Sequence, residues 1–552
     1  MGSGHHRTMT FALAAAVAAS LGCLDLSLEN KAVRCDSKEP DFAQCRASAC
    51  AMRQLSCGFT PDGLDCGPCT DGGTPNDAGI DAGIDAGQDA GFVDGGSLDG
   101  GGSVPLLWAI AAGGTRSITG KSVAFNDDGQ VVVLATSGAG SNWGQLVAAP
   151  GFQLVRFGLD GGFLGATGAG HPTFTSAPAG ALVLPGGDVV VAGTFEGTLR
   201  LPDAAHELNA SDGGDIFVAR TDRALTPRWA KQAGAPNEAA SVVTTALFAD
   251  GVLVTGDYAG PAKFGRGEPN ETTLAAGGVM TRHAYFARYT LAGSFDWVVR
   301  MTGSAVGQAA TSTVDGGVIV GGRFTDTVSF TTVGGIPQSL TALPGTLSGF
   351  LLHLDQNGKA VWSRLLSNGP VNAVRTAPDG SFLVLGTLRG PMMLGSGEPT
   401  QTSLDTVGGN DIYLAHFANT GALRWATRMG STDDDYGADL SVGSNGDIAV
   451  GGRFKGTLGF GAPNAGPTLV SLGLADGLVA LFSASGKVEW AHSISGAGVD
   501  NVESVSLLGD GTVLATGSFM QTANFTLGIN QTKVLSAQGA TFTDAFVARF
   551  AR

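Results

Sequence analysis

The chain has few charged and few aromatic residues, 14% and 7% of its 552 residues, and it is poor in basic side chains. Lys and Arg number 32 against 48 Asp and Glu, so the formal net charge is −16. This charge opposes the phosphate neutralisation that drives nucleic-acid binding, and it excludes DNA and RNA as expected partners. Cysteine is absent after Cys69, so disulfides cannot hold the larger part of the chain together.

Glycine and apolar residues are abundant instead. The chain contains 87 glycines, and 43% of its residues are hydrophobic. This composition is typical of a folded, turn-rich chain with little helix. A length of 552 residues exceeds one ordinary core, which predicts either separate domains or a large closed array of repeats.

The amino terminus has the pattern of an export signal. His5, His6 and Arg7 precede an apolar run over residues 9–21, which is too short to span a bilayer stably. The following "SLGC" resembles the lipobox of bacterial lipoproteins, although Ser20 stands where that pattern prefers a larger aliphatic residue. We expect a signal peptide at 1–22, lipidation of Cys23 and a lipid-anchored tether at 23–34; ordinary secretion with Cys23 free is the alternative.

Six further cysteines lie close together and predict a small disulfide-rich module at residues 35–69: Cys35, Cys45, Cys50, Cys57, Cys66 and Cys69. Six cysteines can form three disulfides in an oxidising compartment, with 15 possible pairings. Cys66 and Cys69 also have the C-x2-C spacing of a zinc site, but no second matching pair exists. Export favours disulfides over zinc.

Residues 70–103 have the composition of a spacer. They contain seven aspartates and neither Lys nor Arg, and they carry too little apolar surface to offset the entropy of ordering. Asp77, Asp81, Asp85 and Asp89 recur every four residues, which matches neither the nonapeptide calcium repeat nor the EF-hand loop. We expect a disordered linker with weak calcium association at most.

Residues 104–552 repeat one pattern seven times. A turn is followed by an alternating apolar strand that ends in a small residue, any residue and an aromatic one, as in "GGDVVVAGTFEG" from Gly186 and "NGDIAVGGRFKG" from Asn445. The copies begin 59 to 66 residues apart, at Asp127, Gly186, Ala249, Asp315, Asp379, Asn445 and Asp510. Each unit is therefore predicted to contain four strands.

A second marker carries a tryptophan and decides how the array ends. Five copies have it at Trp229, Trp297, Trp362, Trp425 and Trp490, and the first copy has Leu164 at the expected place. The seventh copy stops at "DAFVARFAR" without this strand, which is found instead around Trp108. A closed ring explains the split, because the first strand then completes the last sheet. The sequence predicts an all-β, seven-bladed β-propeller with few exposed strand edges.

One copy resembles a known family. "GSTDDDYGADLSVGSNGDIAVGGRFKG", residues 430–456, is similar to the repeat of bacterial exported propellers called SBBP repeats, with its Gly-rich opening, paired aspartates and Tyr-Gly. The resemblance covers roughly residues 108–552 and is diluted in the other copies. It implies an exported propeller and no particular activity or catalytic residue.

A phosphate-binding loop is excluded. In "GGTRSITGKS" five residues separate Gly114 from Gly120, whereas the loop requires four. Gly113 and Gly120 have the same offsets from Trp108 as Gly430 and Gly437 have from Trp425, so they belong to a connection between blades. Lys121 is then expected to be a solvated loop residue.

Other candidate residues have simpler structural explanations. His353 and His416 occupy a strand position that is Arg or Leu in the sister repeats, and His171, His206, His283 and His492 lack metal-ligand spacing. Asp433, Asp434 and Asp435 could hold calcium, although capping of a turn is the expected role. The repeated tryptophans are expected to pack between blades rather than bind sugars. Trp143 lies outside their register, as an exposed contact or a core residue.

The sequence favours a non-enzymatic binding lipoprotein of the bacterial cell envelope, a monomer in the outer membrane, either periplasmic or surface-exposed. Its partners would be the membrane, through the lipid anchor, and a protein or glycan ligand at the propeller rim or channel, since loops on rigid scaffolds carry function. No cofactor is expected. The alternatives are a hydrolase or lyase acting on polysaccharide in the channel, and a periplasmic scaffold for outer-membrane assembly.

Overall fold

A computed structural model describes most of the predicted propeller. The described residues are 55–60, 63–68, 106–114, 116–137, 142–143, 151–170, 176–203, 205–210, 214–234, 240–277, 281–461, 467–528, 531–539 and 542–552. The chain divides into two compact units, Met1–Gly91 and Phe92–Arg552. Regular secondary structure within the described ranges consists of strands only.

In the first unit, β1 (Leu55–Thr60) pairs with β2 (Gly63–Pro68) as an antiparallel hairpin. The backbone register places Cys57 opposite Cys66. The predicted signal peptide, the lipidation site Cys23 and the remaining four cysteines of the module lie outside the described residues, as does the linker at 70–103. The disulfide and lipidation assignments therefore stay predictions.

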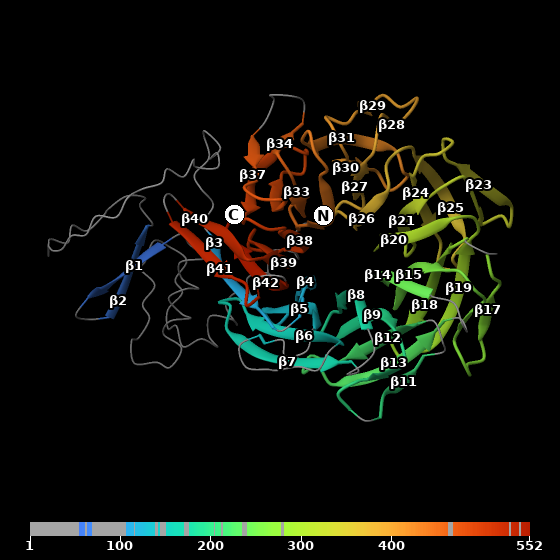
Figure 1. Cartoon of the computed structure of the whole chain (residues 1–552), viewed down its shortest axis with the longest axis horizontal. Helices are drawn as coiled ribbons and strands as arrows, with labels where there is room; N and C mark the ends of the chain where they lie inside the picture. The colour runs from blue at the N-terminus through green and yellow to red at the C-terminus, as the bar shows by residue number, and fades with distance from the viewer. Residues whose placement is uncertain are drawn as a thin grey trace, which may run out of the picture. The chain divides into compact units, whose positions relative to one another are not determined.

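The second unit contains seven four-stranded antiparallel sheets arranged as the blades of a propeller (Figure 1). Blade 1 contains β4 (Gly120–Phe125), β5 (Gln130–Ser137), β6 (Gly151–Gly158) and β7 (Phe163–Ala169), and blade 2 contains β8 (Ser176–Val183), β9 (Val189–Phe195), β12 (Asp215–Thr221) and β13 (Pro227–Ala233). Blade 3 contains β14 (Ala240–Phe248), β15 (Gly251–Tyr258), β18 (His283–Thr290) and β19 (Phe295–Met301). Blade 4 contains β20 (Ala305–Ser312), β21 (Val318–Phe324), β24 (Ser348–Leu354) and β25 (Ala360–Leu366).

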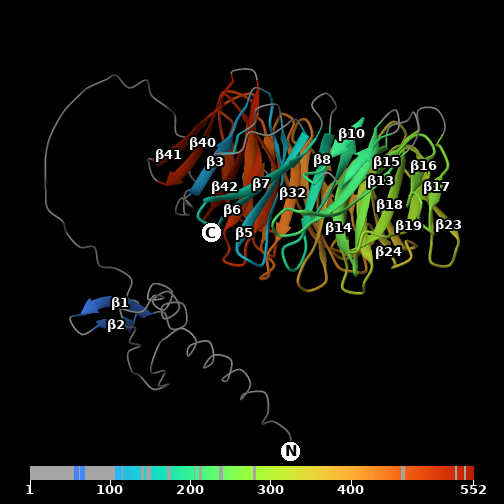
Figure 2. The ribbon, with the colours of Figure 1, turned by 90° about the horizontal axis from the view of Figure 1, so that it is seen from below.

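Blades 5 to 7 follow the same order, from the channel outwards. Blade 5 contains β26 (Val371–Thr376), β27 (Phe382–Leu388), β30 (Asp411–Phe417) and β31 (Leu423–Gly430). Blade 6 contains β32 (Tyr436–Val442), β33 (Ile448–Phe454), β36 (Asp476–Phe482) and β37 (Val488–Ile494). Blade 7 contains β38 (Asn501–Leu507), β39 (Val513–Met520), β42 (Thr543–Phe550) and β3 (Leu106–Ala112). Seen edge-on, these strands run between the two faces of the ring (Figure 2).

The predicted closure of the ring is confirmed. Strand β3, the first of this unit, pairs antiparallel with β42, the last strand of the chain, with Trp108 opposite Arg549. It thus supplies the outermost strand of blade 7, next to residues more than 430 positions later in the sequence. Pairing the two ends of the array removes the free edge that an open array would leave.

Short hairpins fasten each blade to the one before it. Each lies between the second and third strands of its blade. The hairpins are β10 (Thr198–Arg200) with β11 (Glu207–Asn209) in blade 2, β16 (Ala262–Phe264) with β17 (Thr272–Leu274) in blade 3, and β22 (Thr327–Thr331) with β23 (Pro337–Thr341) in blade 4. Blade 5 has β28 (Met392–Leu394) with β29 (Thr402–Leu404), blade 6 has β34 (Thr457–Phe460) with β35 (Thr468–Val470), and blade 7 has β40 (Thr522–Gly528) with β41 (Gln531–Ser536). In blade 6, β34 extends the sheet of blade 5 by pairing with β31.

The core is distributed over the seven junctions between blades. Seven clusters of buried residues are present in the described part of the chain, and each combines side chains of two neighbouring blades. The second and third strands of each blade are covered on both faces, so β15 and β27 are buried at every residue. Trp143 is 1% exposed and belongs to the cluster of blades 7 and 1, which makes it a core residue.

The repeated tryptophans pack between blades, as predicted. The indole N–H of Trp229 donates to the carbonyl of Leu291 in the next blade, 3.0 Å away, and Trp108, Trp297 and Trp362 make the equivalent bond. Each indole lies over a turn glycine of that next blade. At Gly293, where φ is +90°, a β-carbon would stand 2.7 Å from the Trp229 ring, so only glycine fits without a shift.

One register prediction is wrong. Gly165, and not Leu164, pairs with Arg156 at the position where the sister blades have tryptophan. Leu164 is 49% exposed. The number of residues after the arginine of the third strand identifies the position equivalent to tryptophan. Trp229 follows Arg220 by nine residues, and Gly165 follows Arg156 by nine residues.

His353 and His416 are variants of one strand position, as predicted. Both lie on third strands and face the turn between the first two strands of their own blade. His353 Nε2 is 3.4 Å from Asp315 Oδ1, and His416 Nε2 is 2.6 Å from Ser381 Oγ. In blade 2, Arg220 contacts Asp188 in the same way. Burial lowers the pKa of His416 to about 4, so this imidazole is neutral at physiological pH.

Candidate channel site

The first strands of the seven blades line an axial channel. All seven carry a β-bulge at the same place, which inserts one extra residue near the start of the strand. The inserted residues are Lys121, Ala179, Val243, Gln308, Asn372, Ala438 and Glu503, and all of them line the channel. Bulges of this kind re-aim side chains and are frequent beside functional sites.

The glycine of the repeated strand ending is what permits the bulges. In blade 4, a β-carbon on Gly322 would stand 2.0 Å from the carbonyl oxygen of Val306, just before the bulge, and Gly452 faces Tyr436 in the same way at 2.1 Å. A larger residue would push the first strand away. The small residue in the sequence marker therefore positions the backbone that presents side chains to the channel.

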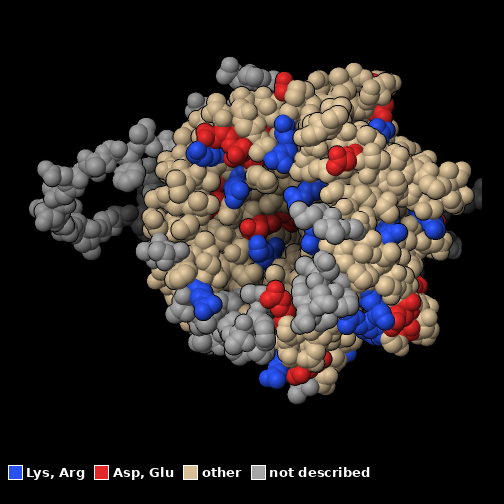
Figure 3. Space-filling model, turned by 45° about the vertical axis from the view of Figure 1, so that its right-hand side comes forward, with Lys and Arg blue, Asp and Glu red and all other residues tan. Residues whose placement is uncertain are grey.

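The channel consists of two chambers. The wide chamber, with a volume of about 460 Å³, is lined by the bulged residues and their neighbours. The narrow chamber, of about 360 Å³, is lined by the following residues of the same strands. Both are bordered by Ser122, Ala181, Thr245, Arg375, Asp439 and Ser504. In the space-filling view, basic and acidic side chains lie together around the hollow in the middle of the ring (Figure 3).

Two ion pairs occupy the wall contributed by blades 5, 6, 7 and 1. Lys121 Nζ is 3.4 Å from Glu503 Oε2, and each of these side chains is 32% exposed. Lys121 is thus a strand residue in the channel, and the expectation of a solvated loop residue is wrong. Arg375 is 2.7 Å from Asp439 Oδ1, while Ser504 Oγ donates to Asp439 Oδ2 at 2.8 Å. These contacts link three neighbouring blades.

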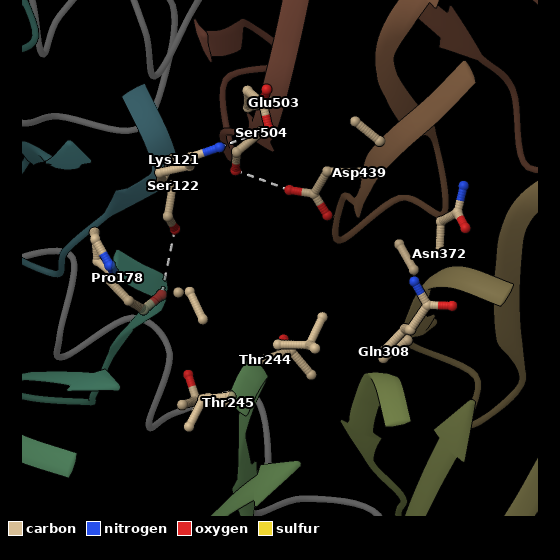
Figure 4. Close-up of a pocket in the computed structure, with 18 of the residues that line it drawn as sticks. Lys121, Ser122, Pro178, Thr244, Thr245, Gln308, Asn372, Asp439, Glu503 and Ser504 are labelled. Carbon is tan, nitrogen blue, oxygen red and sulfur yellow. Dashed lines mark hydrogen bonds and ion pairs between the residues drawn. The ribbon is translucent and has the colours of Figure 1, made fainter. Parts of the chain in front are cut away.

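Two carboxamides lie across the channel from the Lys121–Glu503 pair (Figure 4). Asn372 donates to the carbonyl of Gly437 at 2.7 Å and to Thr387 Oγ1 at 3.0 Å, which fixes its orientation. Gln308 Oε1 is buried and has no hydrogen-bond partner among the described residues. This oxygen is not accessible from the chamber, so only the rest of the carboxamide can meet a ligand.

Tyr436 contributes the aromatic side chain of the wide chamber. Its side chain is 38% exposed, and the guanidinium carbon of Arg453 stands 5.1 Å from the ring centroid. Arg453 also donates to Asn501 Oδ1 at 3.3 Å, which ties blades 6 and 7 together beside the chamber. The remaining wall, on blades 2 and 3, is neutral and includes Ala179, Val243 and Thr244.

In the Asp433–Asp435 cluster, Asp435 caps its own turn, as the simpler of the two predictions expects, and the other two carboxylates bind groups elsewhere in the chain. Asp435 is fully buried and accepts from the amides of Ser431 at 2.6 Å and Lys455 at 3.1 Å. Asp434 accepts from the amide of Asn410 at 2.9 Å, and Asp433 pairs with Lys455 Nζ at 2.8 Å. Nowhere in the described ranges do three or more His, Cys, Asp or Glu side chains group in a way that could hold a metal ion.

Two blade junctions contain buried carboxylates that face each other. Asp411 begins the third strand of blade 5, and the amide of Asp435 bonds to the carbonyl of the preceding residue at 2.7 Å. Asp476 and Asp500 form the same arrangement between blades 6 and 7. Burial raises the pKa of Asp411 and of Asp476 to about 6, that of Asp435 to about 7 and that of Asp500 to about 8.

The comparisons with known proteins add no argument about the fold or the function of this chain. No protein family and no curated protein matches the chain. Solved structures that match include a puromycin hydrolase mutant (TM-score 0.38, 13% identity, 76% of this chain and 54% of that one), the Dos1 propeller (0.37, 8%, 81% and 95%) and BamB from Moraxella catarrhalis (0.25, 14%, 64% and 95%). The chain spans about half the length of the hydrolase. All these TM-scores are below 0.5, so they carry no argument about function.

The class of the protein is thus a seven-bladed β-propeller with a polar axial channel. The likeness to SBBP repeats stays a prediction. Within the described residues no helix is long and apolar enough to cross a membrane. The sequence did not reveal Gln308, Arg375, Asp439 or Ser504 as site residues. The signal that could have found them was the bulge, whose inserted residue is the second to fourth residue of each first strand.

Proposed function

We propose that this propeller is a non-enzymatic binding protein, exported and anchored in the bacterial outer membrane through Cys23, and that the wide chamber is its ligand site. The observation that supports the proposal is the set of seven bulges, which direct seven different side chains into one cavity. A volume of about 460 Å³ falls within the range of small-molecule sites, roughly 300–1,000 Å³.

The pairing of the charged side chains supports binding over catalysis. Asp439 is held by Arg375 and Ser504, and Glu503 is held by Lys121, so each carboxylate already has a partner. A general base needs free access to the proton that it removes. We therefore propose that the chain acts as a monomer that holds its ligand without converting it and requires no cofactor.

Cross-linking and mass spectrometry on intact cells test the anchoring, with Cys23→Ala as the comparison. Cross-links from the face around the wide chamber to envelope components, lost in Cys23→Ala, support an anchored binding protein. Equal cross-links in both proteins contradict the anchor. Turnover of polysaccharide by the purified chain would contradict the non-enzymatic role, and protease shaving of the same cells separates surface display from a periplasmic position.

A further inference from the structure

The wide chamber is charge-balanced. Its lining includes two cations, Lys121 and Arg375, and two anions, Asp439 and Glu503, which form two ion pairs. A charged ligand would have to separate one of these pairs, leaving a partner without its counter-charge inside the channel. An uncharged polar ligand can bind without disturbing either pair.

The hydrogen-bonding groups of the chamber suit hydroxyl groups. Each hydroxyl donates one hydrogen bond and accepts others, and a carboxamide does both as well. Gln308 places its carboxamide in the lining of the chamber, and the Lys121–Glu503 pair, at 3.4 Å, is loose enough for a hydroxyl to contact both atoms. Because these groups lie on opposite sides of the channel, a ligand that spans it needs hydroxyls on both of its edges (Figure 4).

The apolar part of the wall suits the C–H faces of a sugar ring. Ala179, Val243, Ala309, Ala373 and Ala438 lie between the polar groups, and Tyr436 adds a partly exposed aromatic ring at the same chamber. A pyranose presents hydroxyls at its edge and C–H groups on its faces, which is the same alternation of polar and apolar surface. The volume of about 460 Å³ accommodates a short saccharide.

From this placement we propose that the wide chamber binds an uncharged saccharide, with the carboxamide of Gln308 hydrogen-bonded to a ligand hydroxyl and Tyr436 contacting a sugar face. This inference rests on the proposed function and names its ligand class. The Lys121–Glu503 pair contacts the opposite edge of the ligand and stays intact in the complex.

Saturation-transfer NMR on the full chain tests the proposal. The neutral probes are cellobiose, maltose and N,N′-diacetylchitobiose, and the charged probes are digalacturonate and glucosamine. We expect a neutral disaccharide to bind with an affinity that does not change with salt concentration, because no charge is exchanged. Gln308→Met should weaken it about tenfold, as expected for one hydrogen bond lost from the carboxamide. Gln338→Met, at an exposed position of β23, is the matched control.

A double variant separates the ligand class from the site. Lys121→Gln with Glu503→Gln removes both charges but keeps polar groups, so a neutral saccharide should bind within about threefold of the wild type. If only a charged probe binds, with an affinity that salt weakens and the double variant abolishes, the ligand class is wrong while the chamber remains the site. If no neutral probe binds, the saccharide proposal is overturned. Binding that is equal in Gln308→Met and Gln338→Met would overturn the proposed function as well.

Discussion

The junctions between blades and the wall of the wide chamber are built from the same seven repeats, yet the repeats agree at the junctions and differ in the chamber. Four tryptophans make the same indole bond to the next blade, and six second strands have glycine opposite the bulge. The seven bulged residues, in contrast, include a cation, an anion, two carboxamides and three apolar side chains. Residue types thus repeat where they pack one blade against the next, and they vary where they line the wide chamber.

A second difference separates the junctions themselves. Those between blades 5 and 6 and between blades 6 and 7 bury two carboxylates each, whereas the junction between blades 3 and 4 has His283 and Ala305 at the equivalent places. The junctions therefore have the same backbone arrangement, but only those that bury carboxylates are expected to lose stability as the pH rises. Substitutions at junctions should change stability, and substitutions in the chamber should change binding.

The largest effect is expected where a junction depends on glycine. Gly293→Ala should destabilise the propeller by about 4 kcal/mol, because it combines a left-handed backbone with a clash against Trp229. Gly267→Ala is the matched control, since φ there is +75° and no atom lies within 4 Å of the new β-carbon. It should cost about 1 kcal/mol. Thermal unfolding measures both; equal losses would show that the tryptophan contact is unimportant.

The carboxylate pairs predict that stability falls as pH rises. Their pKa values in the folded state, about 6 to 8, exceed the ordinary value of 3.8, so the folded chain binds more protons than the unfolded one above pH 4. The free energy of unfolding should therefore decrease by several kcal/mol as the pH rises from about 4 to about 8. Denaturant unfolding across this range measures it.

The variant Asp435→Asn with Asp500→Asn sharpens this prediction. Both amides are neutral at every pH, so the double variant should lose most of the decrease while remaining folded at pH 5. If the double variant keeps the full pH dependence, the groups that cause this dependence lie outside these two junctions.

A smaller loss is expected in the network that joins the chamber to the junctions. Ser504→Ala removes the hydroxyl that donates to Asp439 and accepts from the amide of Val123 at 3.2 Å. We expect a destabilisation of about 1.5 kcal/mol, the cost of an unpaired buried group. Chemical denaturation measures this loss, and a change of less than a few tenths of a kcal/mol would show that water replaces the hydroxyl.

The smallest stability effect is expected for Gln308→Met in the chamber itself. The methionine has a similar volume, and the acceptor that it removes has no partner in the described structure. The melting temperature should stay within about 2 °C of the wild type while ligand affinity falls. A large loss of stability without a change in binding would assign this position to the junctions instead.

The fold was predictable from the sequence because the residues that pack the blades together recur at regular intervals along the chain. The glycine before each aromatic strand ending, the tryptophan in six of the seven fourth strands and the split of the seventh copy together indicated the number of blades and the partner of the strand at Trp108. Each of these features is a packing requirement that recurs in almost every blade, so one sequence is enough to reveal it.

The chamber was not predictable for the opposite reason. Lys121 was placed in a loop because Gly120 was assigned to a connection between blades, whereas Gly120 begins β4 and Lys121 is the inserted residue of the bulge in that strand. Gln308 lies at the bulge position that all seven blades share, but the residue type there varies between blades, and no short motif marks Gln308 or Arg375. The carboxylate pairs were missed because their partners, Asp411 and Asp435, belong to different repeats and meet only when the blades are assembled.

Native mass spectrometry of the chain purified without denaturation from its natural host tests the central claim, that the chamber holds the ligand. The comparison uses Ala438→Phe, which fills the chamber from a bulge, and Ala484→Phe, at an exposed turn of the same blade. The account predicts one small neutral mass bound to the wild type and to Ala484→Phe, absent from Ala438→Phe, with similar melting temperatures for all three. The same adduct on all three proteins, or none on any, would contradict it.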